Sequence, residues 1–141
     1  MKEKKRRVIL DTNVWVSILI GKRSASIVSQ LSSGSIILVF TDQLLDEIRL
    51  VTTRKKLRKY FPKESVDQLI ELIETIGENV EITPTHFESR DPKDNFLLDL
   101  IAFSKADFLV TGDKDLQTLN PFKTAQILSL SEFEKVLEAS V

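Results

Sequence analysis

Short apolar segments alternate with segments of helical pattern along this chain of 141 residues. The apolar segments are nearly continuous runs rich in Val, Ile, Leu and Phe, at residues 7–11, 35–40, 107–111 and 125–130. Runs of this kind are typical of strands buried on both faces of a parallel sheet. Apolar side chains at helical spacing occupy the other main segments: residues 12–20, 42–51, 64–76, 91–104 and 131–139. The alternation predicts a three-layer α/β/α sandwich with a mainly parallel central sheet.

Shorter signals complete this outline. We expect one more helix, which begins at Ser24 or Ser26, and a short strand at residues 80–82. An Asp-Pro pair at residues 91–92 predicts the start of the fourth long helix. Residues 131–134 (Ser-Glu-Phe-Glu) fit the pattern of a capping box at the start of the last helix.

The length of the chain favours one domain over residues 1–141, with residues 1–5 as a flexible basic N-terminus. No apolar run approaches the roughly 20 residues that a membrane-spanning helix needs. The basic start lacks the apolar core of a signal peptide. We therefore expect a cytoplasmic protein that does not enter a membrane.

The composition restricts the chemistry more than the length does. The chain has no cysteine, and His86 is its one histidine. Disulfides, thiol nucleophiles and iron–sulfur clusters are excluded, and zinc catalysis is strongly disfavoured because it normally uses several imidazoles. A metal would be held by oxygen ligands, which suit Mg²⁺ or Mn²⁺.

Four acidic residues follow predicted strands or begin predicted helices on what should be one edge of the sheet. Asp11 ends the first strand, Asp113 follows the strand at residues 107–111, Glu47 lies on the helix after the second strand, and Asp94 lies near a later helix start. Functional groups of open α/β sheets gather beyond the carboxyl ends of the strands. We therefore expect these carboxylates to converge.

Converging carboxylates repel one another unless a cation neutralises them. A divalent metal would do so, and would also polarise a phosphate oxygen and activate a water molecule. Each acid also has a simpler interpretation. Asp11 alone would be a helix N-cap, Asp94 a favourable first-turn residue, Glu47 a solvated helix residue and Asp113 a turn residue.

Four segments, in order, resemble the motifs of the PIN domain family: residues 8–13 (Val-Ile-Leu-Asp-Thr-Asn), 45–48 (Leu-Asp-Glu-Ile), 91–95 (Asp-Pro-Lys-Asp-Asn) and 109–116 (Leu-Val-Thr-Gly-Asp-Lys-Asp-Leu). The resemblance extends from about residue 7 to about residue 133. Within the family, the chain is similar to VapC-like toxins of toxin–antitoxin pairs. The resemblance implies a Rossmann-like fold and a ribonuclease that uses one or two Mg²⁺ or Mn²⁺ ions.

The resemblance also implies roles for individual residues. Asp11, Glu47 and Asp113 correspond to the first, second and fourth acids of the family, and Asn13 to a polar residue that supports the first acid. For the third acid we favour Asp94. Three further residues are expected to support the site, with Asp99 also an alternative third acid: Asp99, Thr111 and Asp115.

The same resemblance implies RNA as the substrate, a small antitoxin protein as a partner and a homodimer. A basic segment that follows the second acid would contact RNA phosphates through Arg49, Arg54, Lys55, Lys56 and Arg58. The expected function is hydrolysis of RNA phosphodiester bonds by the toxin of a type II pair. The alternative is a PIN-like module that binds RNA or protein with weak or no catalysis.

Two other enzyme classes that place an aspartate at a strand end fit poorly. Haloacid-dehalogenase-like phosphotransferases need a second acid two residues after the first, where this chain has Asn13. Receiver domains need a lysine at the end of a late strand, and residues 127–130 contain none.

Overall fold

A computed structural model of the chain describes residues 5–19, 33–54, 58–86 and 94–139. Five parallel strands form one sheet in the order β3-β2-β1-β4-β5. Their bounds are β1 Arg6–Leu10, β2 Ile36–Phe40, β3 Glu78–Asn79, β4 Phe108–Val110 and β5 Gln126–Leu128. The predicted α/β class is confirmed, and the sheet is entirely parallel.

Strand β1 lies at the centre of the sheet. It pairs with β2 on one side, where Val8 faces Leu38, and with β4 on the other, where Leu10 faces Val110. Val8, Ile9 and Leu10 are completely buried. Burial on both faces explains why this strand is continuously apolar in sequence, without polar alternation.

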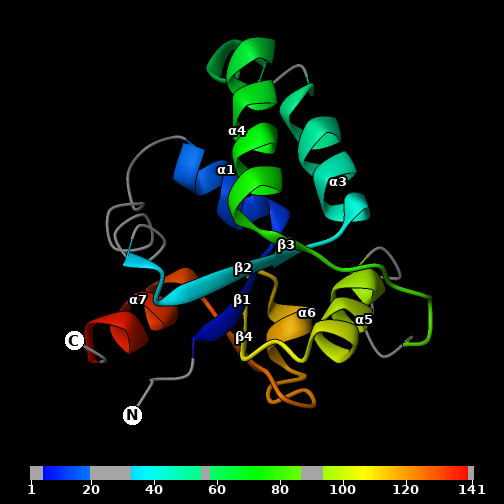
Figure 1. Cartoon of the computed structure of the whole chain (residues 1–141), viewed down its shortest axis with the longest axis vertical. Coiled ribbons are helices and arrows are strands. Elements are labelled where there is room, and N and C mark those ends of the chain that lie inside the picture. The colour runs from blue at the N-terminus through cyan, green and yellow to red at the C-terminus, as the bar shows by residue number, and fades with distance from the viewer. Residues whose placement is uncertain (1–4, 20–32, 55–57, 87–93, 140–141) are drawn as a thin grey trace.

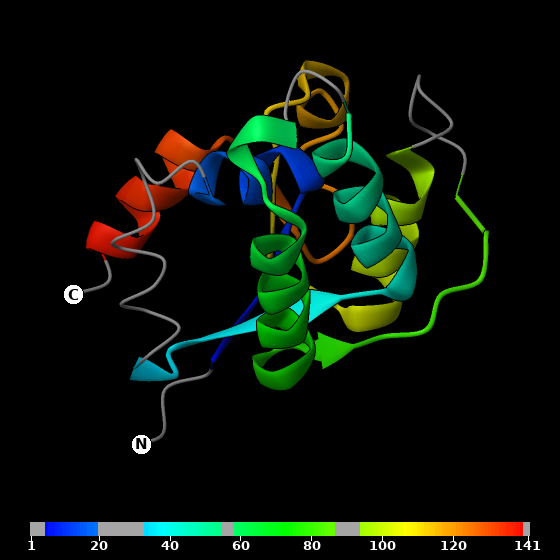
Figure 2. The same ribbon diagram turned by 90° about the horizontal axis from the view of Figure 1, so that it is seen from above.

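Helices cover both faces of the sheet, as Figure 1 shows, with α1, α3 and α4 on one side and α5 and α6 on the other. Their bounds are α1 Thr12–Leu19, α3 Asp42–Thr52, α4 Lys63–Ile76, α5 Asn95–Ser104, α6 Lys114–Gln117 and α7 Leu130–Ala139, with a short 3₁₀ turn at Arg58–Tyr60. Helix α4 lies across β2 in both views (Figures 1 and 2). None of the described helices has the length and apolar character to cross a membrane.

The order of the strands reverses direction at the centre of the sheet. The chain runs from β1 outward through β2 to β3, then returns to β4 on the opposite side of β1 and continues to β5. Between β1 and β4 the connections therefore leave on opposite faces, the place where functional groups of open α/β sheets usually lie. Asp11 follows β1 and Thr111 follows β4, so both lie at this point.

The third strand is not where the sequence predicted it. The prediction placed it at residues 80–82, whereas β3 is Glu78–Asn79 and pairs with the end of β2, with Phe40 facing Asn79. Strand β2 ends at Phe40, so only one further bond forms, from Val80 N to Phe40 O at 2.8 Å. Residues 81 and 82 have no strand beyond Phe40 to pair with, because the chain there turns into α3.

Gly77 lets this strand start directly after α4. A Cβ at this position would lie 2.7 Å from the carbonyl oxygen of Ile73 and 2.8 Å from Cδ1 of Phe40. The helix end thus packs its backbone directly against the Phe40 ring, which brings Glu78 beside β2. Both residues of β3 are polar and exposed, so no apolar pattern marked the strand in the sequence.

The capping box of α7 also lies two residues earlier than predicted. Ser129 N donates to Glu132 Oε1 at 3.0 Å, and Glu132 N donates to Ser129 Oγ at 3.2 Å. The same spacing of serine and glutamate fits both positions in the sequence, and the end of β5 at Leu128 selects the earlier one. The helix predicted from Ser24 or Ser26 and the helix start at residues 91–92 lie outside the described residues.

Candidate active site

Asp11 lies where β1 passes into α1, and it is almost completely buried, with 6% of its surface exposed. Its backbone N donates to Val110 O at 3.0 Å, which fixes it beside the end of β4. Its carbonyl oxygen accepts from Val14 N and Trp15 N at the start of α1. The backbone of Asp11 thus connects the central strand, the neighbouring strand and the first helix.

The Asp11 side chain is not used as a helix cap. An N-cap carboxylate accepts from the backbone N–H groups two or three residues later. Here Oδ1 accepts from Thr12 N at 2.6 Å, and Oδ2 accepts from Thr111 Oγ1 at 2.7 Å. The carboxylate is therefore oriented toward the end of β4.

Thr111 links Asp11 to Asp113. Its hydroxyl donates to Asp11 Oδ2 and accepts from Asp113 N at 3.1 Å, and the residue is completely buried. The Asp113 side chain accepts from Asp115 N through Oδ1 at 2.8 Å and caps α6. No described residue donates to Asp113 Oδ2, so this oxygen is available to a ligand.

The electrostatic environment of Asp11 opposes its ionisation. Burial raises the pKa of the Asp11 carboxyl, and the charge of Asp113 raises it further. The hydrogen bonds from Thr111 and Thr12 lower the Asp11 pKa and offset part of this increase. A cation bound between the two carboxylates would favour the charged form, because it would replace lost solvation with direct attraction.

The other two predicted acids lie on helices near the same edge. Glu47 is half-buried on α3, with Oε2 shielded from solvent, and Asp94 is the half-buried N-cap residue of α5. Among the described residues, no three acidic or imidazole side chains are close enough together to hold a metal ion. The structure thus brings together Asp11 and Asp113 but does not assemble the complete set of four.

The predicted supporting residues fall into different environments. Asn13 is exposed on α1, and within the described part of the chain no hydrogen bond joins its side chain to Asp11. Asp115 contributes its backbone N–H to Asp113. Thr111 makes the hydrogen bonds given above.

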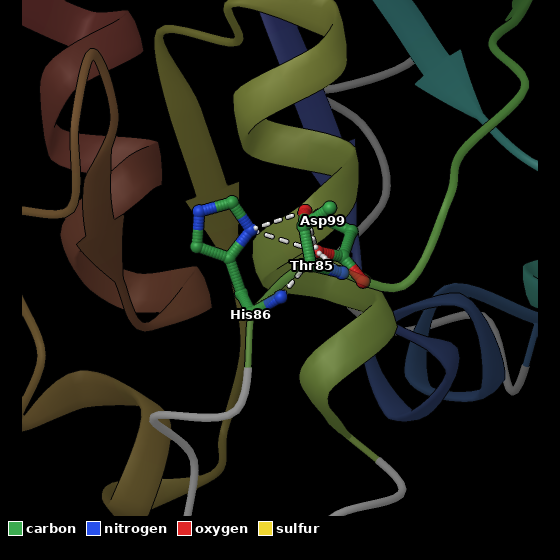
Figure 3. A network of polar contacts seen from close by, with 3 residues as sticks. All are labelled: Thr85, His86 and Asp99. Atoms are coloured by element: carbon green, nitrogen blue, oxygen red, sulfur yellow. Dashed lines mark hydrogen bonds and ion pairs between the residues drawn. The ribbon is translucent and has the colours of Figure 1, made fainter.

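Asp99 belongs to a separate network, which Figure 3 shows in close view. It is 2% exposed on α5, and its Oδ1 accepts from four donors on the segment that follows β3. These donors are Thr85 N (3.1 Å), Thr85 Oγ1 (2.9 Å), His86 N (2.9 Å) and His86 Nδ1 (2.7 Å). Since a carboxylate only accepts, the His86 ring must carry its proton on Nδ1.

This network was not predicted from the sequence, which gave Asp99 only as a supporting residue or an alternative third acid. The partners are 13 and 14 residues apart and follow no periodic pattern. An isolated histidine near a buried aspartate was the one available signal.

The predicted RNA-binding segment is only partly described. Arg49 on α3 forms an ion pair with Asp67 on α4, with Nη1 and Oδ1 2.6 Å apart, and both side chains are about half exposed. Arg54 is exposed after the end of α3. Lys55, Lys56 and the side chain of Arg58 lie outside the described residues.

The donor set at Asp11 fits a hard divalent cation in its chemistry. Both Asp11 oxygens keep lone pairs beyond the hydrogen bonds they accept, and Asp113 contributes Oδ2. Thr12 Oγ1 is also buried beside this carboxylate without a hydrogen-bond partner in the described chain. A buried hydroxyl without a partner normally bonds to a ligand or an ordered water, so Mg²⁺ or Mn²⁺ with its waters would suit the site.

Comparisons with known proteins identify the family of this chain. A model of the PIN domain family matches residues 7–115. Over 124 residues the chain is 32% identical to uncharacterized protein MJ1680 of Methanocaldococcus jannaschii, which covers 84% of this chain and 78% of that protein. The fold is similar to the T. brucei RRP44 PIN domain, with a TM-score of 0.55 and 14% identity over 97% of this chain and 83% of that one.

At 14% identity the likeness to the RRP44 domain concerns the fold alone. The family is established by the match to its model and by the M. jannaschii relative. PIN domains are generally nucleases, and they generally use divalent metal ions. This chain therefore belongs to the PIN domain family.

Proposed function

We propose that this chain is a metal-dependent endoribonuclease whose active site is centred on Asp11. The observation that carries the proposal is the buried Asp11 carboxylate, linked through Thr111 to Asp113 at the point where the strand order reverses. A fold gains nothing in stability from two neighbouring carboxylates of which one is buried. The arrangement is useful if it binds a cation and a phosphate.

Asp11 and Asp113 would hold the ion, and the Thr111 hydroxyl, which bonds to both residues, would fix their positions relative to each other. Mg²⁺ or Mn²⁺, when bound, would supply positive charge that stabilises the phosphate and activates water. The Thr111 hydroxyl lowers the Asp11 pKa, which helps to keep this ligand in its charged form. Whether one or two ions bind depends on the remaining acids.

Glu47 and Asp94 would complete the metal site. Both helices that carry them lie near the carboxyl edge of the sheet: α3 starts two residues after β2 ends, and α5 runs back toward the start of β4. Asp99 fits the third-acid role less well than Asp94, because four donors already occupy its Oδ1.

Basic residues at the end of α3 would contact the RNA backbone. Arg54 is exposed, and Arg49 would have to leave Asp67 to reach a phosphate, an exchange that costs little for an exposed ion pair. Lys55, Lys56 and Arg58 would extend this basic surface. Weakening of RNA binding as the salt concentration rises would test this contribution.

Cleavage of a mixed RNA pool tests the proposed activity. Wild-type protein should cut RNA with Mg²⁺ or Mn²⁺ and should stop when EDTA is added. Asp11→Asn should abolish cleavage, whereas Asp46→Asn, a change at an exposed acid next to Glu47, should not. Cleavage that persists in EDTA or in Asp11→Asn would refute the metal-nuclease assignment.

The same assay separates the alternative function. RNA binding without cleavage, at any metal concentration and with intact fold by circular dichroism, would identify a binding module. If the wild-type protein does cleave RNA, Glu47→Gln and Asp94→Asn serve as further variants, and both should lose cleavage while keeping the fold.

We further propose that the nuclease is the toxin of a type II toxin–antitoxin pair and acts as a homodimer in the cytoplasm. This rests on the resemblance of the four motifs to VapC-like proteins. A small antitoxin would lie across the acidic site at Asp11 and Asp113. Expression of wild-type protein should arrest growth and Asp11→Asn should not. Absence of arrest, or of a small protein that co-purifies from the native operon, would contradict the toxin role.

A further inference from the structure

A cleft of about 230 Å³ lies between the segment after β3, the start of α3 and the first turns of α5. It is lined by Gln43, Ile82, Pro84, His86, Asn95, Phe96 and Asp99. Figure 2 shows this segment running past α5 after it leaves the sheet. The cleft lies on the carboxyl side of the strands, as the Asp11 site does, because β2 and β3 end at its border.

Asp99 is the acidic residue of this lining, and hydrogen bonds hold its side chain in place. Its side chain is almost entirely buried, and all four hydrogen bonds from Thr85 and His86 end on Oδ1 (Figure 3). Within the described residues, no donor reaches the second oxygen, Oδ2. Oδ2 is not fully buried, so it is an acceptor that a donor on a ligand can reach from the cleft.

The rest of the lining indicates a planar heterocycle and not a phosphate. None of the described lining residues is a lysine or an arginine, and Asp99 would repel an anion. Ile82, Pro84 and Phe96 supply apolar surface, while the Gln43 amide supplies both donors and an acceptor. Apolar walls with a few fixed polar groups are typical of sites that bind a small ring system.

We propose that the cleft binds one unpaired base of the RNA, and that this base carries an amino group on its pairing edge. Adenine, cytosine and guanine would donate an N–H to Asp99 Oδ2, and the Gln43 amide would pair with a neighbouring polar atom of the base. Uracil presents two carbonyl oxygens beside its single N–H, and Asp99 would repel them. The inference rests on the proposed function, since it takes the ligand to be part of the RNA substrate.

The cleft would select which RNA is cut. A base held beside α5 fixes the strand relative to Asp94 at the start of this helix, and so relative to the acids between β1 and β4. Sequence-specific RNA recognition commonly uses unpaired bases that enter pockets of this kind.

Proton NMR with the four ribonucleosides tests binding without a phosphate, a metal or catalysis. His86 is the one histidine of the chain, so its ring signals report directly on the cleft wall. Adenosine, cytidine or guanosine should shift these signals saturably, with uridine weaker by at least about fivefold. Gln43→Trp, which places an indole at the cleft mouth, should remove the shift, whereas Gln68→Trp on the exposed side of α4 should retain it.

The absence of a saturable shift with any nucleoside, equal binding of uridine, or unchanged binding in Gln43→Trp would overturn the proposal. A pooled-RNA cleavage assay provides the second measurement. Wild type and Gln68→Trp should disfavour uracil at one position near the cut, and Gln43→Trp should lose this preference. If cleavage depends on Asp11 but nucleosides do not bind, the cleft proposal fails and the nuclease stands. If nucleosides bind but RNA is not cleaved, base binding by the cleft stands and the nuclease proposal fails.

Discussion

Asp11 and Asp99 are both buried aspartates, 6% and 2% exposed, yet their surroundings differ. Asp11 accepts one hydrogen bond on each oxygen, and burial and Asp113 raise its pKa. Asp99 accepts four hydrogen bonds on one oxygen, one of them from an imidazole nitrogen. Burial alone therefore does not distinguish the two acids; the number of donors that each carboxylate accepts does.

The difference has a consequence for the role of each residue. Asp99 holds the segment after β3 against α5, so its loss should affect stability first. The strands beside Asp11 pair through their backbones, so loss of the Asp11 side chain should lower the rate of cleavage more than the stability of the fold. Substitutions of the two aspartates and of the threonines that donate to them test this division.

Replacing Asp99 with leucine should have the largest effect on stability. Asp99→Leu leaves the donors of Thr85 and His86 without their common acceptor, including the His86 ring at 2.7 Å. We expect a loss of about 3 kcal/mol in the free energy of unfolding. Urea denaturation followed by circular dichroism measures it. A loss below about 1 kcal/mol would show that water replaces Asp99 easily.

Replacing Thr111 with valine should impair cleavage while preserving the shape of the core. Thr111→Val removes the hydroxyl that donates to Asp11 and accepts from Asp113 N. Loss of a group that orients a metal ligand typically lowers activity or metal affinity by about 10- to 100-fold. RNA cleavage rates at several Mg²⁺ concentrations measure the effect, with Thr75→Val on the exposed face of α4 as control.

The pH dependence of cleavage sharpens this prediction. The Thr111 hydrogen bond lowers the Asp11 pKa, so its removal should raise that pKa and shift the acidic limb of the pH profile upward. A lower rate with an unshifted acidic limb would mean that Thr111 acts on Asp113 alone.

Replacing Asp11 with asparagine should stabilise the metal-free protein. The folded-state pKa of Asp11 is raised, so folding favours the protonated form. The free energy of unfolding therefore falls as pH rises from the unfolded pKa through the folded pKa, and the penalty persists at neutral pH. Asp11→Asn removes it, although asparagine keeps an acceptor for only one of the two donors.

Thermal unfolding in EDTA across acidic to neutral pH measures this effect. The variant should melt at a higher temperature than wild type at neutral pH, and the difference should narrow as the pH falls. Mg²⁺ should raise the melting temperature of wild type more than that of Asp11→Asn. An equal effect of Mg²⁺ on both proteins would place the ion elsewhere.

Of the two buried aspartates, the sequence predicted the structural position of Asp11 but not the hydrogen-bond network of Asp99. The run that ends at Asp11 reads as a buried strand because both of its faces are covered, and the position of Asp113 follows from the apolar run at residues 107–111. Strand β3 could not be predicted, because its two polar residues are defined by pairing with β2 and by the contact of Gly77 with Phe40.

The role of Asp99 was not predictable for a related reason. Its place on a helix was predicted, but its partners lie on a segment whose course depends on the tertiary fold. Likewise Glu47 was placed on the correct helix, but the rotation of α3 about its axis decides where the carboxylate lies. Pattern and spacing locate residues on elements, and packing between elements then determines which side chains meet.

Replacing Thr85 with valine should have the smallest effect, and it is the closest match to the Thr111 variant. Each threonine hydroxyl donates to a buried aspartate, at 2.9 Å for Thr85 and 2.7 Å for Thr111. Thr85→Val leaves Asp99 with three donors, and Thr85 is itself exposed, so we expect a loss of about 0.5–1 kcal/mol in the free energy of unfolding.

Cleavage by Thr85→Val at saturating metal should stay close to the wild-type rate. If the two valine variants instead lower cleavage equally, then Asp99 is coupled to the chemistry as closely as Asp11. The two buried aspartates would then belong to one site, because the loss of a threonine hydroxyl that donates to either of them would lower cleavage by the same factor. An effect of Thr85→Val on stability alone, measured in urea, supports separate roles for the two carboxylates.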